Sequence, residues 1–325
     1  MRILKRVSPR SLLRFGLAQK LLILALGLCL LIAPNSPSFF MTVHTLFRAT
    51  YYFKNESAAL PRIVVSMSTI DDRISNLPRV VSSLEAQSLK MNRIIVSIPV
   101  NTRFGTLNET RQTETITNLE RYFGPFQRVE GDGAYDNGLL YVQFVQKDYG
   151  PGTKLIGALL VEKDPGTLVV TMDDDCEYDP RTLEALVSHT PQHGALGSLC
   201  EELTRKLGMM SAGHGDLQSY VEPDQGQSRE CFGWLMGYAG VVYRVGFFKE
   251  DVFSYLDHLP QGCFFHDDVW LSGYLFDHKI PRYYYSHVPY PNHFSRHPTE
   301  SINSIPDTQK RHQLPCVEHF QHFGW

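Results

Sequence analysis

The sequence predicts an α/β fold, in which helices cover both faces of a mostly parallel central sheet. Short apolar runs alternate along the chain with amphipathic segments of helical length. The first strand, helix and second strand fall within about 35 residues, which is a βαβ unit and requires parallel strands. The segment 168–172 also has the composition of a strand that is buried on both faces, as in a parallel sheet.

The first half of the predicted domain, residues 61–200, alternates regularly between strands and helices. The first helix is recognised by a single apolar stripe with helical spacing. In chain order we expect a strand at 62–68, a helix from Ile74 to Leu84, a strand at 94–98, a helix at 111–123, a strand at 140–145, a helix at 153–162 and the strand at 168–172.

The second half, residues 201–325, has a less regular pattern. A glycine-rich and aromatic stretch at 231–240 precedes a short expected strand at 241–243. An amphipathic segment follows at 247–259, and a helix is expected to begin at Asp267 and Asp268. The tail from Arg282 is rich in Tyr, His and Pro, and its fold is the least defined by the sequence.

The N-terminal residues predict a membrane anchor. Residues 1–20 carry six basic groups and no acidic group, and residues 21–33 are uninterruptedly apolar. Thirteen helical residues rise only about 20 Å against a hydrocarbon core of roughly 30 Å, so a cleaved signal peptide is the alternative. We expect an uncleaved single-pass anchor at 21–33, with 1–20 cytosolic, 34–60 as a stem, and the rest in the lumen of the endoplasmic reticulum or Golgi.

The charge and the cysteine content indicate which partners and which compartment suit the protein. Removing the six N-terminal cations from 31 basic residues leaves 25 against 34 acidic residues, and this acidic body argues against nucleic-acid binding. Five cysteines lie beyond Cys29, so one or two disulfides are expected in an oxidising lumen, without a defined connectivity. The cysteine spacings give no zinc pattern. Asn55 and Asn108 each begin a glycosylation acceptor tripeptide.

Three consecutive carboxylates follow the buried strand at 168–172. Asp173, Asp174 and Asp175 lie at the carboxyl end of this strand, the edge at which parallel sheets bind ligands. Adjacent carboxylates repel unless a cation neutralises them, and their hard oxygens suit Mg²⁺ or Mn²⁺. A divalent ion in turn suggests a phosphate-bearing substrate. The alternative is a solvated acidic turn before a helix that is capped at Asp179-Pro180.

Four motifs occur in order and together resemble one enzyme family. They are TIDDR at 69–73, DYGPGTKL at 148–155, DDD at 173–175 and HDDVWLSGYL at 266–275. This set resembles the nucleotide-sugar-dependent glycosyltransferases of the GT-A fold, in particular those similar to family 2. The resemblance covers about residues 62–284. It implies that 61–200 binds the nucleotide sugar and that 201–325 binds the acceptor and carries the catalytic base.

The resemblance assigns donor-site roles. The family's D-x-D motif falls on Asp173 and Asp175, which implies that Asp175 ligates Mn²⁺ or Mg²⁺ and that Asp173 contacts ribose or the metal through water, with Asp174 auxiliary. Lys154 would add positive charge at the donor diphosphate, unless it is an ordinary surface lysine. Three further residues would hold the nucleobase and ribose, with turn chemistry and a surface ion pair as the alternative: Thr69, Asp72 and Arg73.

The resemblance also assigns the acceptor side. Asp268 aligns with the family's catalytic carboxylate, and Asp267 occupies a position that is usually Glu. Helix capping is the alternative for both. A C-terminal histidine often completes the metal shell, and we choose His287 over His293 and His297, although such histidines are often only solvated. Three aromatic residues are candidates for stacking on sugar or base, or for the core: Trp234, Tyr238 and Trp270.

The sequence therefore predicts a membrane-anchored, metal-dependent glycosyltransferase of the secretory pathway. It would move a sugar from a nucleotide-diphosphate sugar, with UDP favoured as carrier, to a hydroxyl of a glycan or glycoprotein. A metal-dependent phosphoesterase or nucleotidyltransferase is one alternative, and a catalytically silent glycan-binding module is another. The donor sugar, the acceptor and the anomeric outcome depend on pocket shape and are not predicted.

Overall fold

The computed structural model describes residues 61–102, 105–130, 133–202, 226–294 and 309–321. Pro61–Trp325 forms one compact unit. The predicted basic tail, anchor and stem all fall within residues 1–60 and lie outside the described residues. Within the described part of the chain, no helix is both long enough and apolar enough to cross a membrane.

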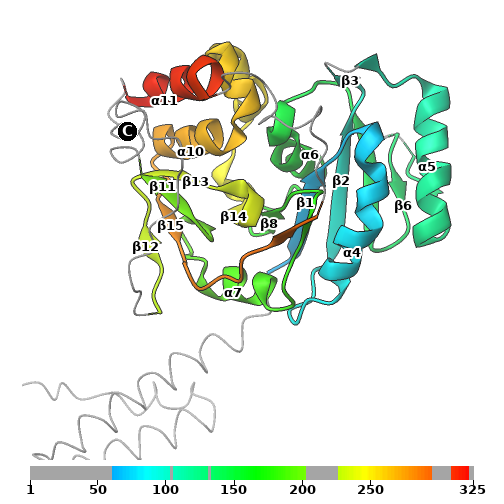
Figure 1. The fold of residues 1–325 in the computed structure, drawn as a ribbon, viewed down its shortest axis with the longest axis horizontal. Helices are drawn as coiled ribbons and strands as arrows, with labels where there is room; N and C mark the ends of the chain where they lie inside the picture. The colour runs from blue at the N-terminus through cyan, green and yellow to red at the C-terminus, as the bar shows by residue number, and fades with distance from the viewer. Residues whose placement is uncertain (1–60, 103–104, 131–132, 203–225, 295–308, 322–325) are drawn as a thin grey trace, which may run out of the picture. The chain divides into compact units, whose positions relative to one another are not determined.

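A ten-stranded sheet forms the centre of this unit (Figure 1). Its strand order is β12-β15-β10-β14-β8-β1-β2-β7-β6-β5. Seven strands run in one direction, and β6, β12 and β14 run in the other. The strands are β1 (Ile63–Ser68), β2 (Arg93–Pro99), β5 (Gln127–Arg128), β6 (Tyr135–Asp136), β7 (Leu140–Val145), β8 (Leu168–Thr171), β10 (Ala195–Gly197), β12 (Arg229–Glu230), β14 (Val241–Arg244) and β15 (Arg282–Tyr284).

Three strand pairs lie outside the large sheet. They are β3 (Asn101–Thr102) with β4 (Gly105–Thr106), β9 (Cys176–Glu177) with β16 (Asn292–His293), and β11 (Cys200–Glu202) with β13 (Gly233–Leu235). Each pair is antiparallel. The β9–β16 pair joins the residues that follow the acidic triplet to the C-terminal tail.

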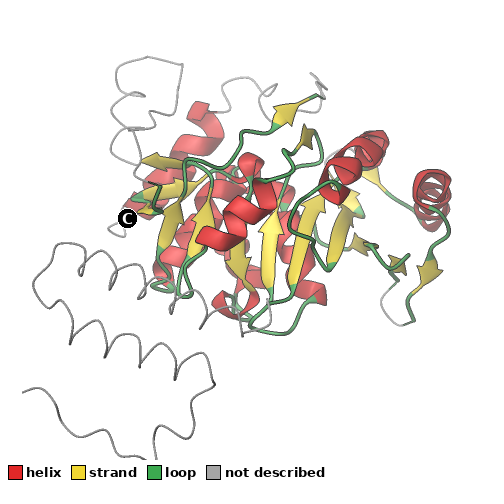
Figure 2. Ribbon diagram, turned by 90° about the horizontal axis from the view of Figure 1, so that it is seen from below, coloured by secondary structure: helices red, strands yellow, loops and turns green. Residues whose placement is uncertain are grey.

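Helices cover both faces of the sheet, as Figure 2 shows from below. One face packs against α6 (Thr153–Val161), α10 (Asp267–Asp277) and α11 (Leu314–Gln321), together with the short α9 (Val252–Tyr255). The other face packs against α4 (Leu77–Glu85), α5 (Glu109–Phe123) and α7 (Thr182–His189). Short helices link these elements: η1 (Asp71–Asn76), η2 (Gly150–Gly152), η3 (Gly237–Ala239), η4 (Val245–Phe247), η5 (Leu256–His258), η6 (Gln261–Phe265) and the π-helix η8 (Gln309–Gln313).

The two cores explain the apolar runs in the sequence. Side chains alternate across a strand, so Val64 of β1 enters one core while Ile63 and Val65 enter the other. In β8, Val169 and Val170 divide in the same way. A strand that feeds two cores needs apolar residues on both of its faces, which confirms the predicted α/β class with both faces of the sheet covered.

Most predicted elements of the first half are found within one or two residues of their expected bounds. The strand at 140–145 has the bounds of β7, and the helix expected from Ile74 is divided into η1 and α4, with Pro78 in the first turn of α4. The less regular second half supplies β12, β14 and β15 to the same sheet, next to β10 from the end of the first half. The two predicted halves therefore share one sheet.

One disulfide joins the two predicted halves, and a second lies within the second half. Cys200 pairs with Cys231, and Cys263 pairs with Cys316, which confirms the expectation of one or two bridges. Cys176 is buried and unpaired. The bridge at Cys263 ties α11 to η6, the segment that leads directly into α10.

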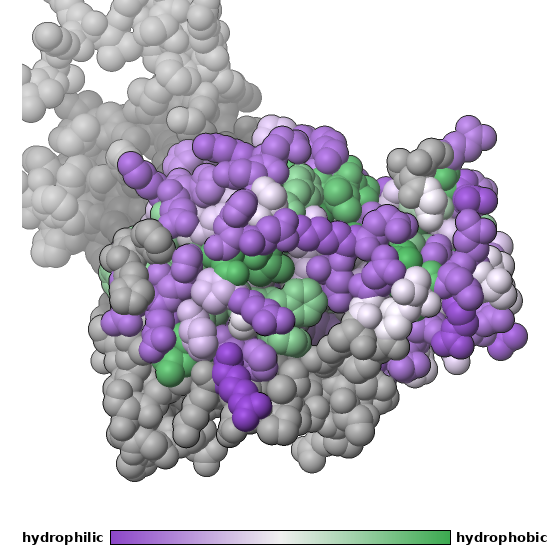
Figure 3. All heavy atoms as spheres, turned by 90° about the horizontal axis from the view of Figure 1, so that it is seen from above, coloured by the Kyte–Doolittle hydropathy of each residue, from purple (hydrophilic) through white to green (hydrophobic). Residues whose placement is uncertain are grey.

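The face shown in Figure 3 is mainly hydrophilic where it is coloured, with small hydrophobic groups between polar side chains. Large hydrophobic side chains that are exposed in the described residues are Tyr122, Leu160, Phe232 and Tyr290. Scattered exposure of this kind is normal for a folded domain.

Candidate active site

The parallel pairing of β1 and β8 brings the first and third sequence motifs to one edge of the sheet. Ser66 of β1 is level with Thr171 of β8, so Thr69 and the acidic triplet leave the sheet side by side. The Thr69 hydroxyl donates to Asp174 Oδ2 at 2.6 Å, and Arg73 forms an ion pair with the same carboxylate. These two contacts of Asp174 connect the segment that contains η1 to the end of β8.

Asp174 is the innermost carboxylate of the triplet. Its side chain is only 5% exposed. Burial raises its pKa to about 7, against the opposing effects of Arg73 and the Thr69 hydroxyl. The predicted nucleoside-binding residues Thr69 and Arg73 are therefore both engaged with the triplet, while Asp72 is exposed on η1. The alternative of a solvated acidic turn does not explain these contacts, because the Asp174 side chain is buried.

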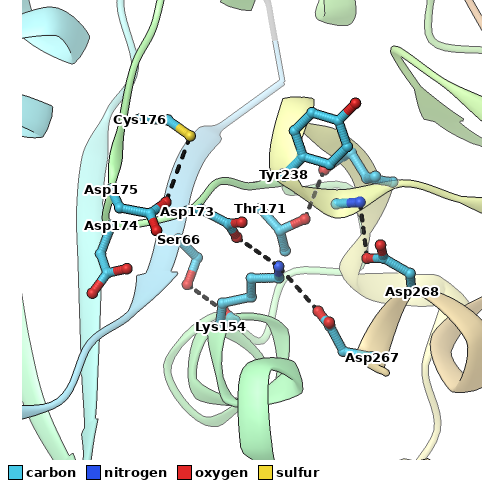
Figure 4. A network of polar contacts seen from close by, with 12 residues as sticks. Ser66, Lys154, Thr171, Asp173, Asp174, Asp175, Cys176, Tyr238, Asp267 and Asp268 are labelled. Carbon is cyan, nitrogen blue, oxygen red and sulfur yellow. Dashed lines mark hydrogen bonds and ion pairs between the residues drawn. The ribbon is translucent and has the colours of Figure 1, made fainter. Parts of the chain in front are cut away.

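Lys154 joins the two acidic motifs. Its Nζ lies 2.8 Å from Asp173 Oδ1 and 3.0 Å from Asp267 Oδ2, as Figure 4 shows. Its side chain is 5% exposed, so the ordinary-surface-lysine alternative is wrong. Burial would lower the pKa of Lys154, but the negative charges of Asp173, Asp267 and Asp268 raise it well above its usual value. The lysine is thus a buried cation between carboxylates.

The same pairing keeps Asp173 ionised. Burial alone would raise the pKa of Asp173, yet the charge and hydrogen bond of Lys154 bring it below its usual value. The backbone N–H of Asp173 donates to the Tyr178 hydroxyl at 2.8 Å, and that hydroxyl donates to the Tyr238 carbonyl at 3.2 Å. Tyr178 therefore connects the end of β8 to η3 on the opposite side of the site.

The glycine turn before α6 places Lys154. Gly150 has φ +59°, and a Cβ there would lie 2.1 Å from the Phe264 carbonyl oxygen. A residue without a side chain is needed for η2 to approach η6 this closely. Because η6 leads into α10, the turn brings the start of α6 next to Asp267. The structure therefore shows a packing role for Gly150.

Asp268 occupies the first turn of α10 and faces η3. Its Oδ1 accepts the backbone N–H of Gly237 at 2.8 Å. Burial and the charge of Asp267 raise the pKa of Asp268 to about 8, with Lys154 acting in the opposite direction. A Cβ on Gly237 would lie 2.6 Å from this carboxylate oxygen. Any larger residue here would displace the Asp268 carboxylate, and the sequence identified Gly237 only as part of a glycine-rich stretch.

Asp267 is not a helix cap. The residue before the helix is His266, and the cap position makes no side-chain hydrogen bond. The Asp267 side chain is 9% exposed and forms an ion contact with Lys154, without hydrogen-bond geometry at Oδ2. Capping therefore does not explain this residue, and its charge acts on Lys154 and Asp268.

Asp175 faces the C-terminal tail. Its Oδ2 lies 2.9 Å from Arg73, while its Oδ1 lies 3.7 Å from His293 Nδ1 and 3.6 Å from Cys176 Sγ. His293 pairs directly with Cys176 across β9 and β16. Burial, together with Asp173 and Asp175, raises the pKa of the Cys176 thiol. Cys176 was not predicted as part of the site.

The histidine candidates differ in position. His287, the predicted ligand, is exposed, and its ring lies 5.5 Å from that of Tyr285. His293, one of the two histidines we ranked below it, lies beside Asp175. His297 lies outside the described residues. The geometry therefore favours His293, and the assignment of His287 stays a prediction without structural support.

The three aromatic candidates differ in how deeply they are buried. Trp234 and Trp270 are fully buried in the core that contains α6 and α10. Tyr238 is partly buried, and its hydroxyl forms a 2.8 Å hydrogen bond with that of Tyr290, which is 65% exposed. Of the three predicted stacking residues, only Tyr238 is placed to meet a ligand.

The residues present suit a divalent cation. The Oδ1 atom of Asp175 and the ring of His293 face one another, and Arg73 holds the other carboxylate oxygen in place. Oxygen and imidazole donors both bind Mn²⁺, and carboxylates bind Mg²⁺. The site thus combines a candidate cation position, a buried lysine and a carboxylate with a raised pKa at one sheet edge.

No protein-family model matches the chain, and no curated protein matches it. Solved structures do match. Staphylococcus aureus TarS 1–349 is 14% identical over 81% of this chain and 72% of that chain, with a TM-score of 0.42. Mycobacterium tuberculosis glucosyl-3-phosphoglycerate synthase, solved with Mn²⁺, UDP and phosphoglyceric acid, is 13% identical over 80% and 78%, with a TM-score of 0.45. TarS 1–349 with UDP-GlcNAc is 13% identical over 81% and 73%, with a TM-score of 0.43. At this level of similarity we draw no functional conclusion from these structures.

Proposed function

We propose that this protein is a metal-dependent glycosyltransferase that moves a sugar from a nucleotide-diphosphate sugar to a hydroxyl of a glycan or glycoprotein. UDP is the favoured carrier. The observation that supports this most strongly is the bridge that Lys154 makes between Asp173 and Asp267. It joins a carboxylate cluster suited to a cation and a second carboxylate pair in a single site.

Asp175 and His293 would hold Mn²⁺ or Mg²⁺, with Asp173 beside them. A divalent cation at that place supplies Lewis-acid stabilisation of the negative charge that develops on a leaving diphosphate. Asp173 keeps its own negative charge through Lys154. Arg73 orients Asp175 through its second oxygen. These contacts fix the carboxylates before any ligand arrives, which lowers the reorganisation needed on binding.

Asp268 is the proposed general base. Its pKa of about 8 lies near physiological pH, where a carboxylate can accept a proton more effectively than one with an ordinary pKa. In a displacement with inversion, Asp268 takes the proton of the acceptor hydroxyl as the acceptor oxygen bonds to the anomeric carbon. The bond between that carbon and the phosphate oxygen breaks, and its electron pair leaves with the nucleoside diphosphate.

The proposed location is the lumen of the Golgi or endoplasmic reticulum, with a single-pass type II anchor at 21–33. The two disulfides support an oxidising compartment, because such bonds are rare in the cytosol. Asn108, in one of the glycosylation acceptor tripeptides, is exposed at the N-cap of α5. An exposed asparagine is compatible with a glycan.

Thermal stability of the full-length protein with nucleotides tests this function. UDP, GDP and CMP and their common sugar conjugates are each added with Mn²⁺ and with a chelator. Ligands that bind the folded state raise the melting temperature by mass action. We expect an upward shift with one nucleoside diphosphate and its sugar conjugate that disappears in the chelator.

The matched variants are Asp175→Asn, which removes a proposed cation ligand, and Glu250→Gln, which removes an exposed carboxylate outside the site. The nucleotide shift should disappear in Asp175→Asn and remain in Glu250→Gln. A panel with no metal-dependent shift would contradict the transferase and favour a silent glycan-binding module. Release of phosphate from added phosphate esters would instead favour a phosphoesterase.

A further inference from the structure

We propose that Asp175, Cys176 and His293 form a binding site for Zn²⁺ or a chemically similar thiophilic divalent ion. This site shares Asp175 and His293 with the proposed Mn²⁺ or Mg²⁺ position and differs from it by the thiol of Cys176. Its third donor is a sulfur atom, which favours zinc, cobalt and cadmium over magnesium.

The distances between the donor atoms are within about 0.1 Å of the range expected around a tetrahedral zinc ion. Cys176 Sγ lies 3.2 Å from His293 Nδ1 and 3.6 Å from Asp175 Oδ1, and the two latter atoms are 3.7 Å apart. Bond lengths of about 2.3 Å to sulfur and about 2.0–2.2 Å to nitrogen and oxygen place tetrahedral ligands about 3.3–3.6 Å from one another. All three donor atoms lie within 4.8 Å of one another.

The backbone holds these donors in place. Cys176 and His293 are direct partners in the β9–β16 ladder, and the N–H of Phe294 donates to the Asp175 carbonyl at 3.2 Å. Neighbouring side chains secure the same strand pair, because Asn292 donates to Glu177 at 3.2 Å. A site formed by paired strands needs little rearrangement to accept an ion.

The surroundings also suit a dication. A thiolate and a carboxylate would balance its two positive charges, with neutral imidazole as the third ligand. Arg73 binds the second oxygen of Asp175 and so directs Oδ1 toward the sulfur and the imidazole. His293 is 46% exposed, whereas Cys176 is fully buried. An ion can therefore enter from the histidine side, and a fourth ligand position remains on that side for water.

Co²⁺ is the probe for this site, because its thiolate charge-transfer band and its tetrahedral visible bands report sulfur ligation directly. Full-length protein with intact disulfides is titrated with Co²⁺. We expect both sets of bands to saturate at one equivalent and to disappear on addition of equimolar Zn²⁺, but not of equimolar Mg²⁺. Octahedral bands without a thiolate band would overturn the proposal.

The variants assign the ligands. Cys176→Ser should abolish the thiolate band, and His293→Ala should weaken Co²⁺ binding at least tenfold. His293 is substantially exposed, so its variant tests the site even where a change at the buried cysteine disturbs folding. Cys29→Ser and the exposed His258→Ala are the thiol and imidazole controls and should bind Co²⁺ as the unmodified chain does. A band that survives Cys176→Ser, or that is lost in Cys29→Ser, would place the sulfur elsewhere.

A consequence for activity rests on the proposed transferase function. Zn²⁺ at this site would occupy Asp175 and His293, the two proposed ligands of the cation that serves the donor. Zn²⁺ should therefore inhibit transfer supported by Mg²⁺, and Cys176→Ser should lessen the inhibition. The cobalt spectra need neither donor nor acceptor. Failure of the transferase proposal would therefore leave the spectroscopic result unchanged, and failure of the metal site would leave transfer measurable.

Discussion

The Nζ atom of Lys154 lies 3.0 Å from Asp267 Oδ2, although these residues come from α6 in the first half of the domain and α10 in the second half. The contact is possible because η2 packs closely against η6, so the start of α6 lies next to the start of α10. The end of β8 carries Asp173, which contacts the same Nζ at 2.8 Å. Lys154 therefore holds the two acidic motifs together.

Replacing Lys154 by Met should destabilise the protein strongly. The change leaves two mostly buried carboxylates without their cation, and breaking a buried pair in this way costs about 3–5 kcal/mol. Chemical denaturation of the full-length protein measures the loss. Lys147→Met is the control, because Lys147 is 42% exposed in its pair with Asp257 and such surface pairs contribute about 1 kcal/mol or less. Equal losses in both variants would show that the buried bridge has no special role.

Gly237→Ala should reduce transfer without removing any functional group. The new methyl carbon would lie 2.6 Å from Asp268 Oδ1 and 3.0 Å from Lys154 Nζ, so the carboxylate must move. Displacement of a catalytic group by about 1 Å can lower the rate about 100-fold. Steady-state kinetics measure the effect. Gly166→Ala is the control, since its nearest neighbour is the flexible Asp164 side chain at 3.3 Å. A normal rate in Gly237→Ala would show that Asp268 does not take part in sugar transfer.

The pH dependence of kcat/KM should follow Asp268. A base with a pKa of about 8 loses activity as pH falls below that value, about tenfold per pH unit once it is mostly protonated. Asp267→Asn removes the neighbouring charge that raises this pKa, so the acid limb of the profile should move to lower pH. Glu250→Gln should leave the limb in place. An unchanged limb in Asp267→Asn would contradict the electrostatic coupling of the pair.

The raised pKa of Asp268 also makes the free energy of unfolding depend on pH. Between the ordinary pKa of about 4 and the folded value of about 8, the folded state retains a proton that the unfolded state has lost. The contribution of Asp268 is therefore fully present below pH 4 and is lost as pH rises to about 8. Asp268→Asn should flatten the decline in unfolding free energy over this range, measured by denaturation at a series of pH values. A decline of unchanged slope in this variant would contradict the raised pKa.

The sequence predicted the first half of the fold more completely than the second, and the reason is physical. Strands such as β1 and β8 are buried on both faces and begin with three apolar residues in a row, a pattern that is visible without a structure. The strand β15 contains Arg282, Tyr283 and Tyr284, and its place in the sheet depends on partners far away in the chain. Such a strand has little local signal.

The candidate site was likewise predicted only in part. The acidic triplet and the Asp267-Asp268 pair were predicted, because consecutive carboxylates at element ends are a local pattern. The contact between Cys176 and His293 was not predicted, since 117 residues separate them and only the β9–β16 pairing brings them together. Burial of Lys154 was equally invisible, because it depends on the approach of η2 to η6.

Removing the Cys263–Cys316 bridge should weaken the protein and the start of α10. The bridge closes 53 residues of chain, and a disulfide of this kind stabilises a fold by about 2–4 kcal/mol. Thermal unfolding of the Cys263→Ala/Cys316→Ala double variant measures the loss. The corresponding double variant of Cys200 and Cys231 is the comparison. Stability equal to that of the unmodified chain would contradict a structural role for the bridge.

A comparison of variants at Asp175 and Asp268 tests most directly the central claim that these residues have different roles. Donor binding, measured calorimetrically with a nucleotide sugar and Mn²⁺, and sugar transfer are compared in Asp175→Asn and Asp268→Asn. We predict that Asp175→Asn abolishes metal-dependent donor binding, whereas Asp268→Asn retains donor binding and loses transfer. Equal loss of donor affinity in the two variants would contradict a site in which one acidic motif holds the donor and the other activates the acceptor.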